Sequence, residues 1–378
     1  MKQLRVLHTE SSMELGGQEY ATLTLAEGLR ARGHVVTLVV RTGSLLQASA
    51  NARGIPCQTI TMSKFYYPWA VLQLCAIIRE AHIDVIHTHG SPDNWIGALA
   101  AWFSRSKPVV VLARHKSTPI AKHAVNRLLY HQLVDRIVST GGESLRRWLI
   151  ADHGFPEHHV VAIPTGADVE RFSPSTERIS FREELGVGLN DCLIGSVCFL
   201  RSYKGLDYFI EAAAIIVKQS SLCRFVVVGD GPERERVEKK ITELQLCDRF
   251  VLVGHREDVP NIMAALDIFV VSSIAGETLT QTIPQALATE TPVVATKIGS
   301  IPDIIQHGET GLLVSPCNSQ ELASQIYALV ENPAIGRTMA QKGRKQVEQS
   351  FSSQSTVSKN EGLYYQLLHE KPMACSHE

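Results

Sequence analysis

The polar segment from Ser272 to Thr282 is the part of the sequence best suited to bind a charged, hydroxyl-rich ligand. It follows the apolar run Ile268–Val271 and leads into a stretch with helical spacing that starts near Gln281. Glu277 lies in the expected loop, and Gln285 lies one turn into the expected helix. Backbone N–H groups at a helix start attract anions, and an acid beside them accepts hydrogen bonds from hydroxyls. The segment therefore predicts a site for both a phosphate and a sugar, although a structural turn capped by an acid would also explain these residues.

Two cations lie close together at the start of another predicted helix. Lys204 precedes Gly205, and Arg201 lies three residues upstream. A positioned pair of cations stabilises the charge that grows on a departing diphosphate, and it does so without a metal ion. The sequence has no Asp-x-Asp motif between apolar flanks that would bind one. The alternative for both side chains is that they are solvated surface charges.

Three histidines follow predicted strands of the first half. His87 and His89 end the run 84–87, and their spacing places both on one face of a strand, as a metal site would need. No third ligand is evident from the sequence, which favours a structural role or contact with an acceptor. His115 follows the run 109–113, at the carboxyl edge where ligands bind in open α/β sheets.

The elements that must position these residues alternate between short apolar strands and amphipathic helices. Continuous apolar strands separated by helices predict parallel sheets covered on both faces, which is a doubly wound α/β fold. The expected strands are 35–40, 84–87, 109–113 and 136–139 in the first half, and 193–198, 225–229, 250–253, 268–271 and 293–295 in the second.

The alternation of strands and helices is interrupted between about 170 and 190. This interruption predicts two domains with a ligand cleft between them. We expect one domain over residues 1–170 and a second over 171–350. The remaining 351–378 should form a helix that packs back towards the first domain, followed by a frayed tail.

Composition excludes several classes of protein. Among 378 residues, 37 Lys and Arg face 38 Asp and Glu, so the net charge is −1 and gives no support for nucleic-acid binding. The eight cysteines are scattered and indicate reduced thiols in a cytoplasmic protein. No apolar run is long enough to predict a transmembrane helix. Residues 1–170 nevertheless hold 17 Lys and Arg against 13 Asp and Glu, whereas the rest is acidic.

Taken together, these segments resemble the GT-B glycosyltransferases of family 4, whose signature contains two glutamates in the spacing E-x7-E. The resemblance extends over roughly residues 1–350. Besides the segment from Ser272 to Gln285, the segments that resemble family motifs are Gly16-Gly17, Asp84–His89, Ile163–Asp168, Lys204-Gly205 and Gly229–Glu233.

The resemblance implies two Rossmann-like domains, an acceptor-binding domain over residues 1–170 and a nucleotide-sugar-binding domain over 171–350. It also implies a retaining transfer of sugar from a nucleotide diphosphate to a hydroxyl of a glycan or lipid-linked acceptor. It implies a place in bacterial surface polysaccharide or lipopolysaccharide synthesis, and no metal or other cofactor. Glu277, His115 and Lys204 would be the catalytic residues. The donor would contact Gly17, Arg201, Lys204, Glu277, Thr278, Leu279, Thr280 and Gln285, and Arg256 is a weaker candidate for the nucleobase.

The sequence departs from the family pattern at two positions. Gln285 replaces the second glutamate, so a hydrogen bond to the donor ribose would lack charge assistance. Phe199 stands where an arginine is usual, which leaves Arg201 as its nearest substitute. Two alternatives follow from these departures: a GT-B enzyme that epimerises a nucleotide sugar, or a GT-B scaffold without catalysis.

A basic stretch after His115 bears on the acceptor. Apolar residues alternate there with Arg114, Lys116, Lys122, His123 and Arg127, which predicts an amphipathic helix with a cationic face. Such a helix would hold an anionic acceptor or dock on the cytoplasmic face of a membrane, although a solvated face has the same pattern.

Overall fold

The computed structural model describes all residues except 1, 175–176, 189, 277, 279 and 372–378. It divides into two compact units. The first unit comprises Met1–Thr165 together with Ser353–Glu378, and the second comprises Gly166–Ser352.

The first unit is a seven-stranded parallel sheet in the order β3-β2-β1-β4-β5-β6-β7. From β1, strands β2 and β3 are added on one side and β4 to β7 on the other, so the strand order reverses between β1 and β4. Ligands bind at such a point in open parallel sheets. The strands are β1 (Arg5–Glu10), β2 (Val35–Arg41), β3 (Cys57–Ile60), β4 (Val85–Thr88), β5 (Val109–Arg114), β6 (Arg136–Ser139) and β7 (Val160–Ala162).

Helices cover both faces of this sheet because successive strand residues point to opposite sides and both sets are apolar. One face packs against α3 (Tyr67–Glu80), α4 (Ser91–Phe103), the π-helical η2 (Leu129–Leu133) and α6 (Glu143–His153). The other packs against α1 (Gly17–Ala31), α2 (Leu45–Ala52) and α15 (Ser353–Glu370). Short helices η1 (Lys64–Tyr66), α5 (Ala124–Leu128) and η3 (Glu157–His159) complete the unit.

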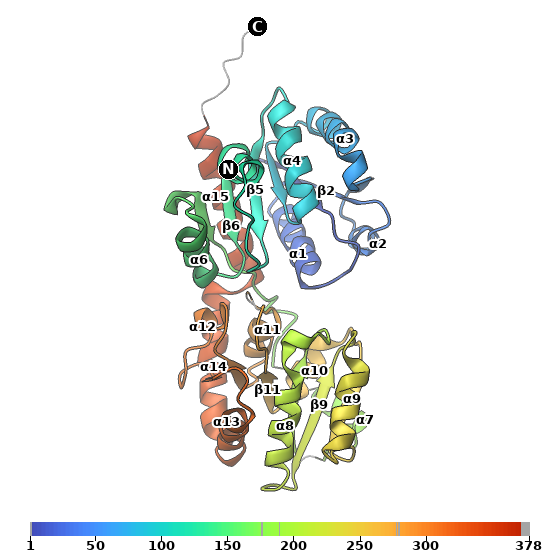
Figure 1. Cartoon of the computed structure of the whole chain (residues 1–378), viewed down its shortest axis with the longest axis vertical. Helices are drawn as coiled ribbons and strands as arrows, with labels where there is room; N and C mark the ends of the chain where they lie inside the picture. The colour runs from blue at the N-terminus through green and yellow to red at the C-terminus, as the bar shows by residue number, and fades with distance from the viewer. Residues whose placement is uncertain (1, 175–176, 189, 277, 279, 372–378) are drawn as a thin grey trace. The chain divides into compact units, whose positions relative to one another are not determined.

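The last helix, α15, belongs to the first unit although the whole second unit separates them in sequence. It lies against α1 and β5, and Figure 1 shows it in red beside β5 and β6. Val357, Leu363, Tyr364 and Leu367 enter the core between this helix and the sheet. The closeness of α1 and α15 depends on Gly28, where a Cβ would come within 2.3 Å of the Val357 side chain.

The second unit repeats the architecture with a six-stranded parallel sheet in the order β10-β9-β8-β11-β12-β13. Its order reverses between β8 and β11. The strands are β8 (Cys192–Val197), β9 (Cys223–Val228), β10 (Phe250–Gly254), β11 (Ile268–Val271), β12 (Val293–Thr296) and β13 (Leu312–Val314). The helices are α7 (Ile179–Glu184), η4 (Ser202–Lys204), α8 (Leu206–Ile216), α9 (Arg234–Glu243), α10 (Val259–Ala265), α11 (Thr282–Ala288), α12 (Ile301–Ile304), α13 (Ser319–Glu331) and α14 (Pro333–Ser350).

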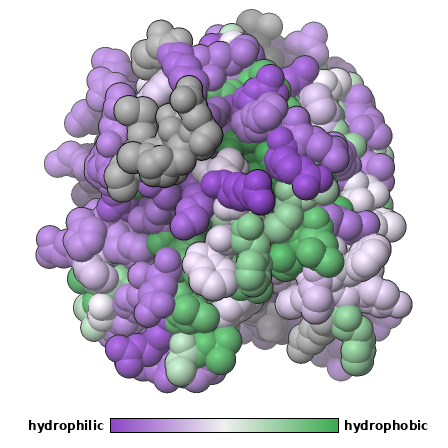
Figure 2. Space-filling view, turned by 90° about the horizontal axis from the view of Figure 1, so that it is seen from above, coloured by the Kyte–Doolittle hydropathy of each residue, from purple (hydrophilic) through white to green (hydrophobic). Residues whose placement is uncertain are grey.

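The predicted fold class of two Rossmann-like α/β domains is confirmed. Every strand expected from an apolar run forms, with ends that differ by one or two residues. None of the helices within the described ranges is both long and apolar enough to cross a bilayer. The face of the molecule in Figure 2 is largely hydrophilic, with apolar side chains gathered on one part of it.

The predicted amphipathic helix after His115 is wrong. Residues 115–123 form no helix, and only α5 follows, with five residues, before η2. Pro119 explains the difference, because a proline excludes the helical conformation from the residue before it. That residue, Thr118, is instead held by Arg114, whose guanidinium donates to its hydroxyl over 3.1 Å.

Candidate functional site

The second unit has a narrow polar hollow where its strand order reverses. The carboxyl ends of β8 and β11 meet there, and the loops that follow these strands close over them. Several residues with hydroxyl side chains and one lysine line the hollow, a combination suited to an anion, and the lysine ammonium lies 5.3 Å from the centre of the Tyr203 ring. The lining residues are Ser196, Val197, Cys198, Lys204, Val271, Ser272, Ser273, Thr280 and Thr282.

Lys204 is fixed in this lining by the backbone around it. The Ser272 hydroxyl donates to the Lys204 carbonyl over 3.0 Å, and the Ile274 N–H donates to the Tyr203 carbonyl over 2.8 Å. Gly205 follows with a φ of +60°, and a Cβ there would come within 2.2 Å of the Ser272 carbonyl oxygen. Only glycine fits this position, so the loop after β11 and the segment before α8 are locked together.

Arg201 lies next to the same segment. Its side chain is exposed, and the guanidinium carbon lies 5.1 Å from the centre of the Phe199 ring. A cation is attracted to the face of an aromatic ring at this distance. The phenylalanine that departs from the family pattern therefore supports Arg201, the cation we expect to replace the missing arginine.

The loop between β11 and α11 carries the remaining predicted donor contacts. Glu277 and Leu279 lie outside the described residues. Thr278 is half-buried and its carbonyl accepts from the Ser300 N–H over 3.3 Å. The hydroxyls of Thr280 and Thr282 are 3.2 Å apart, and both residues line the polar hollow. Gln285 is half-buried on the first turn of α11.

Arg256, the weaker nucleobase candidate, is engaged by acids of its own unit. Its guanidinium donates to both carboxylate oxygens of Asp258, over 2.8 and 2.9 Å, and to Glu184 over 2.6 Å. These hydrogen bonds raise the pKa of Arg256 and lower that of Asp258. Its contact with a nucleobase stays a prediction, and such a contact would have to compete with two carboxylates.

In the first unit, the glycine pair lies at the carboxyl end of β1. Gly16 caps α1 and Gly17 is its exposed first residue. The Glu19 carboxylate accepts from the Gly16 N–H over 2.8 Å, which fixes the entry of the chain into the helix. An exposed glycine at this point leaves the backbone open to close approach by a ligand.

Sequence reasoning missed Glu10, the last residue of β1. Its carboxyl is buried and accepts from the Gln18 amide over 2.8 Å and from the Ser12 N–H over 3.1 Å. Burial, and then the nearby Asp93 carboxylate, raise the pKa of Glu10 to about 8. An acidic residue at the carboxyl end of a central strand was the available signal.

His115 is held at both of its ring nitrogens. Nδ1 lies 3.1 Å from the Thr140 hydroxyl, and Nε2 lies 3.2 Å from Nδ1 of His89. Burial lowers the pKa of His115 to about 3, with further lowering from Lys116 and Arg114. The ring is therefore a neutral hydrogen-bonding group at neutral pH.

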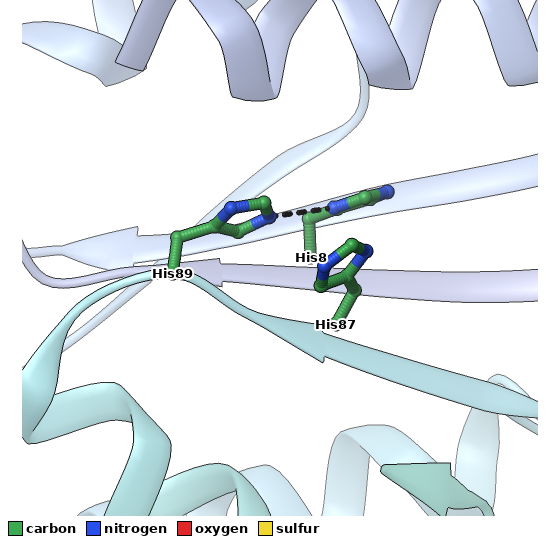
Figure 3. Close-up of side chains that lie close together, drawn as sticks. All are labelled: His8, His87 and His89. Atoms are coloured by element: carbon green, nitrogen blue, oxygen red, sulfur yellow. Dashed lines mark hydrogen bonds between the residues drawn. The ribbon is translucent and has the colours of Figure 1, made fainter. Parts of the chain in front are cut away.

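The histidine cluster of the first unit is formed by His8, His87 and His89, with His115 at its edge. His8 pairs with His87 in the register of β1 and β4, and the His89 ring stacks against both of their rings, which are tilted to each other (Figure 3). His8 Nδ1 lies 3.0 Å from His89 Nε2. Sequence reasoning identified His87 and His89 but not His8, because the pairing of β1 with β4 brings it there.

The first unit has a hollow of its own, of about 430 Å³, between the segment 120–131 and the end of α6. Lys122, Arg127, His131 and His153 line it, with Asp152 as an acid among them. Burial lowers the pKa of His131 and His153, and the neighbouring Arg127 and Lys122 lower them further. Two permanent cations at one opening make the hollow attractive to an anion.

Two parallel Rossmann-like units, each with polar groups where its strand order reverses, define a GT-B protein. Two family profiles match the chain: "Glycosyltransferase Family 4" over residues 15–171 and "Glycosyl transferases group 1" over residues 192–332. The two profiles match successive parts of the chain, which belongs to the GT-B glycosyltransferases of family 4.

Characterised relatives match over nearly their full length. An N-acetyl-alpha-D-glucosaminyl L-malate synthase of Bacillus anthracis is 23% identical, with 94% of this chain and 95% of the relative covered. An Escherichia coli UDP-Gal:alpha-D-GlcNAc-diphosphoundecaprenol alpha-1,3-galactosyltransferase is 25% identical, with 97% and 98% covered.

Solved structures share the fold. A glycosyltransferase from Rickettsia africae superposes with a TM-score of 0.89 at 21% identity and covers 98% of this chain and 100% of its own. HepE from Anabaena, in complex with UDP, has a TM-score of 0.85 at 23% identity and covers 96% and 100%.

Proposed function

We propose that this glycosyltransferase moves a sugar from a nucleotide-diphosphate sugar to a hydroxyl of a glycan or lipid-linked acceptor, with retention of anomeric configuration. The observation that carries the proposal is the position of Lys204. It is held at the polar hollow beside the carboxyl ends of the paired strands β8 and β11, and Thr280 and Thr282 line the same hollow. The solved complex of HepE with UDP is consistent with such a donor.

In this proposal the diphosphate is the leaving group, and the protein stabilises its growing charge. Lys204 and Arg201 supply the positive charge, and backbone N–H groups and hydroxyls of the loop before α11 bind the distal phosphate. A phosphate oxygen of the donor takes the acceptor proton as the sugar is attacked from its front face. The transfer would then require no metal at the diphosphate, and Glu277 would bind sugar hydroxyls.

The first unit would receive the acceptor. His115, oriented by Thr140 and His89, would direct an acceptor or donor hydroxyl. The hollow with Lys122 and Arg127 suits an acceptor that carries phosphate. The E. coli relative acts on a diphosphoundecaprenol-linked sugar, which is an acceptor of this chemistry. A role in bacterial surface polysaccharide or lipopolysaccharide synthesis follows as part of the proposal.

An acceptor on a lipid would place the protein at the cytoplasmic face of a membrane. The segment around α5 combines exposed Lys122 and Arg127 with exposed apolar Val125 and Leu128. Basic and apolar side chains together are the usual composition of surfaces that bind anionic bilayers.

The direct test is a transfer assay with UDP-, GDP- and ADP-sugars and undecaprenyl-diphosphate-linked acceptors, with the anomeric configuration of the product read by NMR. We expect one donor to give a product of retained configuration. Lys204→Ala should lower kcat/KM by about 10²–10³-fold, as the loss of one charge-stabilising donor does. The exposed Lys218→Ala is the matched control and should leave transfer unchanged.

Other outcomes would contradict the proposal. Free epimerised nucleotide sugar, formed without acceptor, would show an epimerase of the same fold. A chain that binds no donor and turns over none would be a scaffold, the role that Gln285 and Phe199 would then explain.

A further inference from the structure

The histidine cluster of the first unit contains two buried ring nitrogens that lack a hydrogen-bond partner among the described residues. His8 is 0% exposed, His87 is 1% exposed and His89 is 6% exposed. Nε2 of His8 and Nε2 of His87 are both buried and have no hydrogen-bond partner among the described residues. Buried polar atoms are nearly always paired, so two unpaired nitrogens on neighbouring strands need an explanation.

The geometry of the three rings provides one. One nitrogen from each ring lies within 4.8 Å of a nitrogen of each other ring. In a tetrahedral site with zinc–nitrogen bonds of about 2.0–2.1 Å, the nitrogens lie about 3.4 Å apart. Rotation of the side chains would be needed to bring one nitrogen of each ring to this spacing around one ion, because the unpaired Nε2 of His8 lies on the side of its ring away from His89 (Figure 3). His89 would exchange its hydrogen bond with His8 for a metal bond.

One of the three rings, that of His87, has the surroundings of a known metal-binding histidine. Such a histidine usually donates its second ring N–H to a fixed oxygen, which sets the tautomer. His87 Nδ1 lies 2.6 Å from the Tyr364 hydroxyl of α15, so Nε2 is free to bind a metal when Nδ1 carries the proton. Nδ1 of His89 lies 3.2 Å from Nε2 of His115, so its partner is a ring nitrogen and its Nε2 is the atom that could turn to a metal.

We propose that His8, His87 and His89 bind a divalent transition-metal ion of the zinc class beside the carboxyl ends of the paired strands β1 and β4. Imidazole ligands favour zinc, copper and nickel over magnesium or calcium. The ion would join β1 to β4 and fix His89, and through His89 it would fix His115. It is a structural ion in this proposal, distinct from any ion at the donor diphosphate.

The test is the metal content of the full-length chain, purified without a polyhistidine tag. We expect about one zinc ion per chain by mass spectrometry, or after titration of chelator-treated protein with zinc sulfate. Cobalt(II) chloride should give the intense visible bands of a tetrahedral nitrogen-bound ion. His8→Gln and His87→Phe should lose both signals, since each removes a ligand while filling much of the ring's volume.

His159→Gln is the matched control, because His159 is another buried histidine of the same unit whose Nε2 lies 2.6 Å from the Tyr130 carbonyl. It should keep the metal. Equal metal content in wild type and His87→Phe would overturn the proposal. Should the cluster variants fail to fold, the wild-type cobalt spectrum and the change in Tm between zinc and chelator decide. Absent bands with an unchanged Tm would likewise overturn the proposal.

Discussion

At the scale of single residues, Gln285 gives the sharpest test of donor binding. A carboxylate accepts a hydrogen bond from a ribose hydroxyl more strongly than an amide does, by about 1 kcal/mol. We therefore expect Gln285→Glu to lower the donor KM about fivefold, with kcat little changed. Steady-state kinetics measure this, and Gln341→Glu on the exposed surface of α14 is the control. An unchanged or higher KM would show that Gln285 does not contact the ribose.

His159 provides a prediction about pH. Burial lowers its pKa in the folded state, whereas the unfolded chain binds a proton below about pH 6.5. Its contribution to stability is therefore complete above that pH and is lost as the pH falls. Between about pH 7 and pH 5, the Tm of His159→Gln should fall less steeply than that of wild type.

The control for this prediction is the exposed neighbour His158, for which His158→Gln should leave the slope of Tm with pH unchanged. Parallel curves for wild type and His159→Gln would show that this imidazole does not contribute to acid sensitivity.

Residues differ in how far the sequence predicts them. Lys204 and His115 could be predicted as site residues because each follows a recognisable strand or precedes a recognisable helix. His8 was not found as a partner of His87, because their contact depends on the pairing of β1 with β4, and neighbours in sequence do not reveal which parallel strands pair. Glu10 was missed for a similar reason, since its raised pKa depends on burial and on Asp93.

At the scale of elements, the junction between η4 and α8 is set by Gly205. Gly205→Ala would force a Cβ against the Ser272 carbonyl at a positive φ, so the loop that carries Lys204 must move. We expect unfolding free energy to fall by more than about 2 kcal/mol and donor affinity to weaken. Urea unfolding and donor titration measure the two effects.

Gly186→Ala is the matched control for this change. Gly186 has nearly the same φ, +63°, but open space where its Cβ would be. It should lose only about 1 kcal/mol and keep its donor affinity. Equal losses in the two variants would show that backbone conformation alone, and not the contact with Ser272, matters at Gly205.

The strands were predicted well because buried parallel strands are continuous apolar runs, such as Phe225–Val228 and Ile268–Val271. The helix expected after His115 does not form, because Pro119 interrupts the alternation of apolar and basic residues on which that prediction depends. A single proline changes local conformation more strongly than periodicity does. Periodicity thus predicts elements reliably only where no such residue interrupts it.

At the scale of the whole molecule, the near-zero net charge conceals a basic first half. Lys116, Lys122 and Arg127 are exposed there. Each is worth about 1 kcal/mol near an anionic bilayer, so replacing all three with glutamine should weaken binding to anionic liposomes by roughly two orders of magnitude. Vesicle sedimentation measures this, and binding should also fall with salt.

Three exposed lysines of the second unit serve as the control for charge alone: Lys218, Lys342 and Lys345, each replaced by glutamine. This variant should bind liposomes as wild type does. Equal binding by both triple variants would show that Lys116, Lys122 and Arg127 do not form a membrane-binding surface.

The central claim is that the second unit binds a nucleotide-sugar donor through Lys204. A ligand at about one hundred times its Kd stabilises the native state by about 2.7 kcal/mol, which raises Tm by several degrees. Thermal shift against UDP-, GDP- and ADP-sugars should therefore show one donor that raises the Tm of wild type and of Lys218→Ala but not of Lys204→Ala. No shift with any donor, or an equal shift in Lys204→Ala, would contradict the account.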